Sequence, residues 1–106
     1  MPNNYKNAKV DLTTTDVTVL YTCPAATSLV NSILVSEDSG NADTITVTIT
    51  DADAAVFSLF KVKAVSANTT VELLTAPLVV QESEILKVTA ATANRLHVVA
   101  SFLEVS

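Results

Sequence analysis

The chain has 106 residues, a formal net charge of −5 and 49% hydrophobic residues, few of them aromatic. This length fits one domain of ordinary size, and the acidic balance argues against nucleic acid and anionic membranes as direct partners. A single cysteine, Cys23, excludes an intrachain disulfide and, with the lone His97, cannot form a zinc site. Because the start of the chain has no apolar secretory segment and no stretch is long enough to span a bilayer, we expect a soluble protein made in a cytoplasm.

Along the chain, residues 1–7 are polar and are predicted to form an N-terminal arm, which leaves residues 8–106 as a single domain. Hydrophobic alternation with a period of two then predicts about nine short strands rich in valine and threonine. We expect these strands at residues 8–12, 17–22, 29–36, 43–51, 56–65, 71–74, 78–80, 84–90 and 95–105.

Short strands at regular spacing, joined by polar connectors, are typical of an all-β protein. The predicted fold is an antiparallel two-sheet β-sandwich with about eight or nine strands, and jelly-roll and immunoglobulin-like connectivity remain equally open. Gly40 is the only glycine, and its freedom at positive φ predicts a hairpin reversal in a protruding loop. A brief helical turn is best placed at Asp51 to Val56, where Asp51 or Asp53 would cap it.

No catalytic residue is predicted, because His97 is the only imidazole that could serve as a general base. His97 falls in mid-strand, and alternation places it on the solvent side with Arg95, Val99 and Ser101. The other face of the same strand carries the apolar residues Leu96, Val98, Ala100 and Phe102. We therefore expect His97 to be a surface residue of the sheet without a chemical role.

Metal and cofactor sites are not predicted either. The acidic residues Asp38, Asp43, Asp51 and Asp53 lie in two connectors, but neither connector has the longer ligand series and the closing glutamate of a calcium loop. One glycine cannot build a phosphate-binding loop. Cys23 has no basic neighbour in sequence and is expected to be a buried, inert thiol, and Asn68-Thr-Thr70 is expected to form a turn.

A family resemblance rests on three segments. They are Tyr21-Thr-Cys-Pro-Ala-Ala-Thr-Ser-Leu-Val-Asn-Ser-Ile-Leu-Val-Ser36, the Thr/Val strand at residues 44–50, and the closing strand Leu96-His-Val-Val-Ala-Ser-Phe-Leu-Glu-Val105. In this order they resemble the small β-sandwich virion proteins of tailed bacteriophages over roughly residues 8–105. Members of that group often have a glycine before the penultimate strand, where this chain has Gln81-Glu-Ser-Glu84.

The resemblance implies a non-enzymatic virion protein, first of all a decoration or cement protein on the outside of a phage head. Its implied partners are the major capsid protein or other virion proteins, and lattice geometry makes a homotrimer the first expectation. The alternatives are a tail or fibre component, or a surface module that binds host glycans through Glu37 to Asp43 and Asp51 to Ala55. An enzyme that uses His97 is the third possibility.

Overall fold

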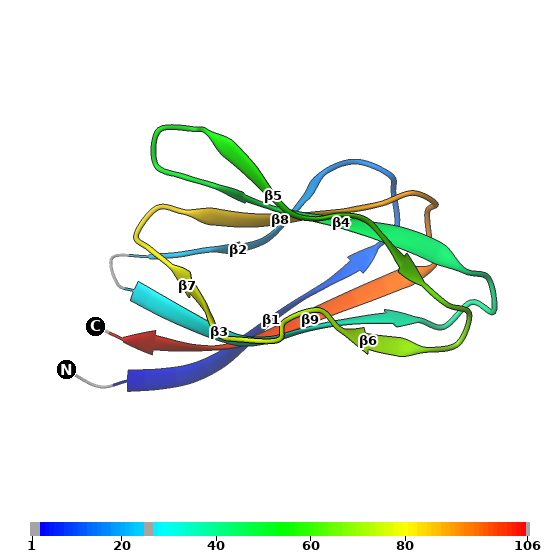
Figure 1. Ribbon diagram of the computed structural model, residues 1–106, viewed down its shortest axis with the longest axis horizontal. Coiled ribbons are helices and arrows are strands. Elements are labelled where there is room, and N and C mark those ends of the chain that lie inside the picture. Colours follow the sequence, from blue (N-terminus) through cyan, green and yellow to red (C-terminus); the bar gives the residue numbers. More distant parts are fainter. Residues whose placement is uncertain (1–2, 25–26, 106) are drawn as a thin grey trace.

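The computed structural model describes residues 3–24 and 27–105, which form nine strands and no helix. The strands are β1 (Asn3–Leu12), β2 (Thr18–Thr22), β3 (Thr27–Glu37), β4 (Asp43–Thr50), β5 (Val56–Val65), β6 (Thr70–Glu72), β7 (Leu78–Val80), β8 (Ile85–Ala90) and β9 (Leu96–Val105). They build two packed layers, so the predicted all-β sandwich is confirmed (Figure 1). Within the described ranges, no helix is long and apolar enough to cross a membrane.

The order of the strands identifies the connectivity. One sheet has the order β1-β9-β3-β6, with β7 also paired to β3, and the other has the order β2-β8-β4-β5. Every pairing is antiparallel. The pairs form a nested series, from the outermost to the innermost: β1 with β9, β2 with β8, β3 with β6 and β7, and β4 with β5. A long hairpin rolled up in this way is a jelly roll, in which β6 and β7 share the position of one strand. The immunoglobulin-like alternative is therefore wrong.

The core lies between the two layers because each strand turns its apolar alternate positions inward. In β4 and β9 the alternation is nearly perfect, and the buried apolar residues of β9 are Leu96, Val98, Ala100 and Phe102, as predicted. The core is built mainly from small aliphatic side chains that are fully buried. The largest of these are Leu12, Ile33, Ile45, Leu86 and Leu96.

Strand β1 begins earlier than the sequence indicated. Residues 3–7 of the expected arm 1–7 pair with the end of β9, starting at Asn3 opposite Val105, while residues 1–2 lie outside the described part of the chain. The sandwich therefore includes the segment that polarity had assigned to an arm. Its polar residues suit an edge strand, because the β1 residues that pack on the core, Ala8, Val10 and Leu12, lie toward the other end.

The connector after β4 is a tight turn and contains no helical turn, which corrects the expectation for Asp51 to Val56. The Asp51 carboxylate accepts hydrogen bonds of 2.9 Å from the backbone N–H groups of Asp53 and Ala55. Ala54 adopts a positive φ of 65°, which reverses the chain instead of propagating a helix. Asp51 caps this turn as predicted, although the turn belongs to the β4-β5 hairpin.

The loop between β3 and β4 contains Gly40 at a φ of 84°, so the positive φ predicted for this glycine is confirmed. The predicted hairpin is wrong, because β3 and β4 lie in different sheets and do not pair with each other. A buried carboxylate organises this loop: Glu37 accepts hydrogen bonds from the backbone N–H groups of Ser39, Gly40, Asn41 and Asn68 and from the Ser39 hydroxyl. Burial raises the pKa of Glu37, but these hydrogen bonds outweigh it and lower the pKa to about 2. Glu37 thus holds the β3-β4 loop next to the loop that contains Asn68, between β5 and β6.

Candidate functional site

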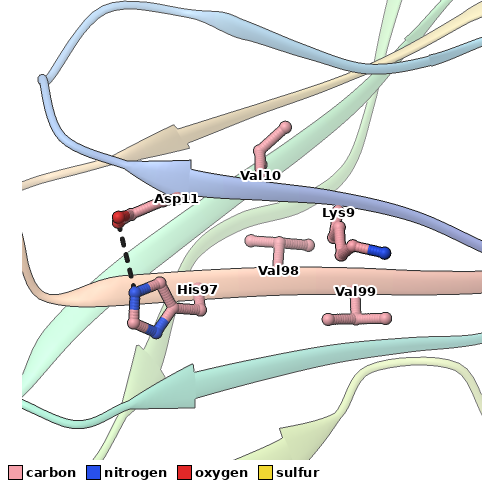
Figure 2. A pocket seen from close by; sticks show the side chains of 6 residues that line it. All are labelled: Lys9, Val10, Asp11, His97, Val98 and Val99. Atoms are coloured by element: carbon pink, nitrogen blue, oxygen red, sulfur yellow. Dashed lines mark ion pairs between the residues drawn. The ribbon is translucent and has the colours of Figure 1, made fainter.

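His97 lies on the outer face of the β1-β9-β3-β6 sheet, as alternation predicted, with its side chain 43% exposed. Its Nε2 atom is 3.2 Å from Asp11 Oδ1 on β1, and its Nδ1 atom is 3.4 Å from Asp38 Oδ2 in the β3-β4 loop. Figure 2 shows the pair formed with Asp11 across the two strands. Both ring nitrogens therefore face carboxylates.

The hollow beside His97 is small. It measures about 230 Å³, below the usual range for small-molecule sites, and it is lined by residues 9–11 and 97–99 (Figure 2). A hydrolase would need a hydroxyl or thiol hydrogen-bonded to the imidazole, and no such bond to His97 occurs among the described residues. The arrangement brings β1, β9 and the β3-β4 loop together at His97, with both carboxylates within 3.4 Å of the ring.

The acidic connector residues are not brought together. Asp38 faces His97, whereas the Asp43 carboxylate is buried and accepts a hydrogen bond of 3.1 Å from the backbone N–H of Thr92. Asp51 caps its own turn in the other connector. Within the described ranges, no group of three His, Cys, Asp or Glu side chains is arranged to hold a metal ion.

The two loops proposed as glycan-binding rims lie at opposite ends of the sandwich. Residues 37–43 precede β4 and residues 51–55 follow it, so the length of β4 separates them by about 25 Å (Figure 1). One short glycan therefore cannot contact both loops. Cys23 is buried as predicted, with its thiol 3.4 Å from the carbonyl oxygen of Val80, and Asn68 occupies a turn at a φ of 55°.

The feature that the sequence did not reveal is an apolar row across the outer face of the β1-β9-β3-β7 sheet. Tyr5 is opposite Leu103, Leu103 is opposite Leu29, and Leu29 is opposite Val79. Residues opposite one another in register share a face, and the buried neighbours of Leu103 show that this face points to solvent. We call these four residues the outer row.

The outer row combines exposed and half-buried apolar side chains. Tyr5 is 81% exposed and Val79 is 51% exposed, whereas Leu29 and Leu103 are half-buried between them. Val105 is close to the row along β9 and is also exposed. The next positions along the strands on this face are polar: Ser101 on β9 lies between Ser32 on β3 and Asn7 on β1. Apolar surface that is continuous across four strands is a feature of protein interaction sites.

A buried polar network supports the strands beneath the outer row. The Tyr21 hydroxyl donates a hydrogen bond of 2.6 Å to Glu104, and the Ser28 hydroxyl lies 2.5 Å from the Tyr21 oxygen. Lys6 approaches the other oxygen of Glu104 at 2.9 Å. The hydrogen bonds from Tyr21 and Lys6 keep the pKa of Glu104 below its ordinary value. The network joins β1, β2, β3 and β9, so it holds the outer row in place.

Comparisons with known proteins match this fold without identifying a family. No protein-family model matches the sequence, and no curated protein matches it. Among solved structures, the acid-stable capsid of Helicobacter pylori bacteriophage KHP30 contains a chain with a TM-score of 0.61 and 12% identity, over 97% of this chain and 87% of that one.

Two further solved structures share the architecture. A subunit of the disulfide-linked pili of Bacillus endospore appendages has a TM-score of 0.58 and 9% identity, over 97% of this chain and 88% of that one. A chain of infectious bursal disease virus, Gt strain, has a TM-score of 0.50 and 10% identity, over 99% of this chain and 30% of that one. At such identities the likeness establishes the fold alone.

Proposed function

We propose that this chain is a non-enzymatic structural protein of a virus particle, and more specifically a decoration or cement protein that binds the outer surface of a tailed-phage head. The observation that carries the proposal is the outer row of Tyr5, Leu103, Leu29 and Val79. The jelly-roll fold, which the KHP30 capsid chain shares, and the sequence resemblance to phage virion proteins both support it.

The outer row has the composition of a binding surface. An exposed tyrosine contributes a large ring at a low entropic cost, and aliphatic neighbours fill the area around it. Covering apolar surface contributes about 25 cal/mol for each Å² removed from water. The chain is acidic overall, with a formal net charge of −5, which keeps a protein present in many copies soluble until it meets its partner. We propose the major capsid protein or another virion protein as that partner.

Binding to heads tests the proposal. Heads of the phage that encodes the chain, prepared without the protein, are mixed with the purified protein and sedimented. We expect the protein to co-sediment with the heads, and we expect Val79→Lys to weaken binding by about tenfold or more because it places a charge in the outer row.

The matched control is Val17→Lys. Val17 is 63% exposed, compared with 51% for Val79, but it lies in the connector just before β2 of the other sheet. This variant should bind heads like the unmodified protein. The proposal fails if the unmodified protein stays in the supernatant, or if both variants bind equally well.

The alternative function is a tail or fibre component, or a module that binds host glycans. The separation of residues 37–43 from residues 51–55 disfavours a glycan site that uses both loops. Assembly through disulfides, as in the Bacillus pili, is disfavoured because Cys23 is only 2% exposed. Imaging the protein within purified particles separates a head location from a tail location. The homotrimer expected from lattice geometry is an alternative to the twofold dimer inferred below, and the oligomeric state in solution decides between them.

A further inference from the structure

The four edges of the two sheets differ in how well they are protected against pairing with another chain. Strand β2 has only five residues and a register shift between Val19 and Tyr21. Strand β5 has two register shifts against β4, and Val62 within it has a φ of 52°. The edge formed by β6 and β7 consists of two segments of three residues each. Short or bulged strands of this kind prevent edge-to-edge association.

The fourth edge, β1, is long and regular. It extends over ten residues, pairs with β9 in unbroken register, and has no other pairing partner among the described residues. Residues 4–7 are exposed, and Tyr5 is the most exposed large hydrophobic residue of the described chain. Such an edge presents a continuous row of backbone N–H and C=O groups to solvent.

Two backbone hydrogen bonds show which groups point away from β9. The carbonyl of Leu12 accepts a hydrogen bond from the backbone N–H of Asn94, two residues before the start of β9, so the even-numbered residues of β1 face β9. The carbonyl of Asp11 instead accepts from Thr13. Because neighbouring residues of a strand direct their N–H and C=O groups to opposite sides, Tyr5, Asn7 and Lys9 present theirs at the free edge.

We infer that β1 is the pairing edge for a second copy of this chain, in an antiparallel arrangement about a twofold axis centred on Asn7. Antiparallel self-pairing requires residues of the same parity to be opposite one another. Registers centred on Lys6 or Lys9 place two lysines directly opposite each other, which is unfavourable. Of the remaining long registers, the one centred on Asn7 pairs the most residues at the free edge and leaves the buried Leu12 outside the contact.

Side-chain chemistry supports this register. Lys9 lies opposite Tyr5 of the second copy, which suits a contact between an ammonium group and an aromatic ring. Lys6 lies opposite Ala8 of the second copy and keeps its ion pair with Glu104. The two β1-β9-β3 sheets become one continuous sheet. The outer row of each copy then meets Lys9 of the other copy, and Val99 and Leu34 of that other copy follow in the same line across the sheet. The inference depends on the edge alone and stands whether or not the protein belongs to a virion.

Proline at position 7 tests the inference. Because the N–H of Asn7 points away from β9, Asn7→Pro removes no backbone hydrogen bond to β9 but blocks the pairing with a second copy. Asn7→Pro and Asn7→Ala both lose the bond of 3.1 Å that the exposed Asn7 side chain accepts from Lys9 Nζ, so the two variants are matched in that respect. In sedimentation equilibrium at submillimolar concentration, we expect the unmodified protein at twice its chain mass of 11.1 kDa and Asn7→Pro at the single mass. Asn7→Ala retains the N–H and should remain a dimer, and circular dichroism should show native strand content for all three proteins.

A crosslinking variant keeps the test decisive if Asn7→Pro does not fold. Asn7→Cys should be joined to a second copy by a short bismaleimide, whereas Thr70→Cys, on β6 at the opposite edge of the same sheet, should not be. The native Cys23 is only 2% exposed, so the unmodified protein serves as the blank. A monomer, a trimer, a dimer that survives Asn7→Pro in a folded protein, or equal crosslinking at both positions would overturn the inference.

Discussion

Removing the Tyr21 hydroxyl should destabilise the protein by breaking the network beneath the outer row. In Tyr21→Phe the ring remains, so its contact with Phe102, at a centroid distance of 4.2 Å, is retained. The variant loses the hydrogen bond of 2.6 Å to the Glu104 carboxylate and the bond of 2.5 Å with the Ser28 hydroxyl. Bonds to charged groups contribute about 1.5–3 kcal/mol. Lys6 still satisfies the other oxygen of Glu104, so we expect a loss of about 2 kcal/mol in the free energy of unfolding.

For a domain of this size, a loss of about 2 kcal/mol lowers the melting temperature by roughly 8 °C. Thermal and urea unfolding, followed by circular dichroism at pH 7, measure the loss. Tyr5→Phe is the matched control, because Tyr5 is 81% exposed and its hydroxyl should contribute less than about 0.5 kcal/mol. A double-mutant cycle with Glu104→Gln should give a coupling of about 1–2 kcal/mol. Equal effects of the two tyrosine variants, or additive effects in the cycle, would refute the role of the network.

Three other substitutions have defined outcomes. Glu37→Gln should lower the melting temperature at neutral pH. The pKa of Glu37 in the folded protein is about 2, below its ordinary 4.5. The contribution of its ionised carboxylate to the free energy of unfolding is therefore complete above pH 4.5 and is lost as the pH falls toward 2. The difference in melting temperature between the variant and the unmodified protein should shrink over that interval. Thr50→Val should stabilise the protein by about 1 kcal/mol in urea unfolding. The reason is that Thr50 Oγ1 is the one buried side-chain polar atom of the described residues without a hydrogen-bond partner. Thr48 is only half-buried, so the control Thr48→Val should change the free energy of unfolding little. Val62→Gly should raise the urea midpoint by relieving about 1–3 kcal/mol of strain at its positive φ, and a lower midpoint would show that the bulge is unstrained.

Strand existence could be predicted from local alternation, but the placement of strands side by side could not. Ile45, Val47 and the buried residues of β9 lie where the period of two placed them. In β2 the same period fails, because the register shift between Val19 and Tyr21 lets Leu20 and Tyr21 both point inward while Val19 stays exposed. A bulge of this kind depends on the neighbouring strand, so its position is not encoded by alternation.

The candidate surface was missed for a related reason. Tyr5, Leu29, Val79 and Leu103 come from four segments far apart in the sequence, and only the register across β7, β3, β9 and β1 aligns them. The same limit applies to Glu37 and Glu104, whose polarity suggests solvent although both are buried. Their hydrogen-bonding partners include Asn68 and Tyr21, which are distant in sequence. His97, by contrast, could be placed on the solvent face because that assignment needs only its immediate neighbours.

The nested strand pairing also determines how this chain must fold. The β4-β5 hairpin closes a short loop, whereas Asn3 meets Val105 only after nearly the whole polypeptide has been brought together. Contacts between residues far apart in sequence slow folding, because the entropy of loop closure is lost before the contact forms. We therefore expect folding on the millisecond to second scale, with the central hairpin forming early and β1 joining last. Until β1 joins, the flank of β9 is open, and a nascent chain is then most prone to aggregation.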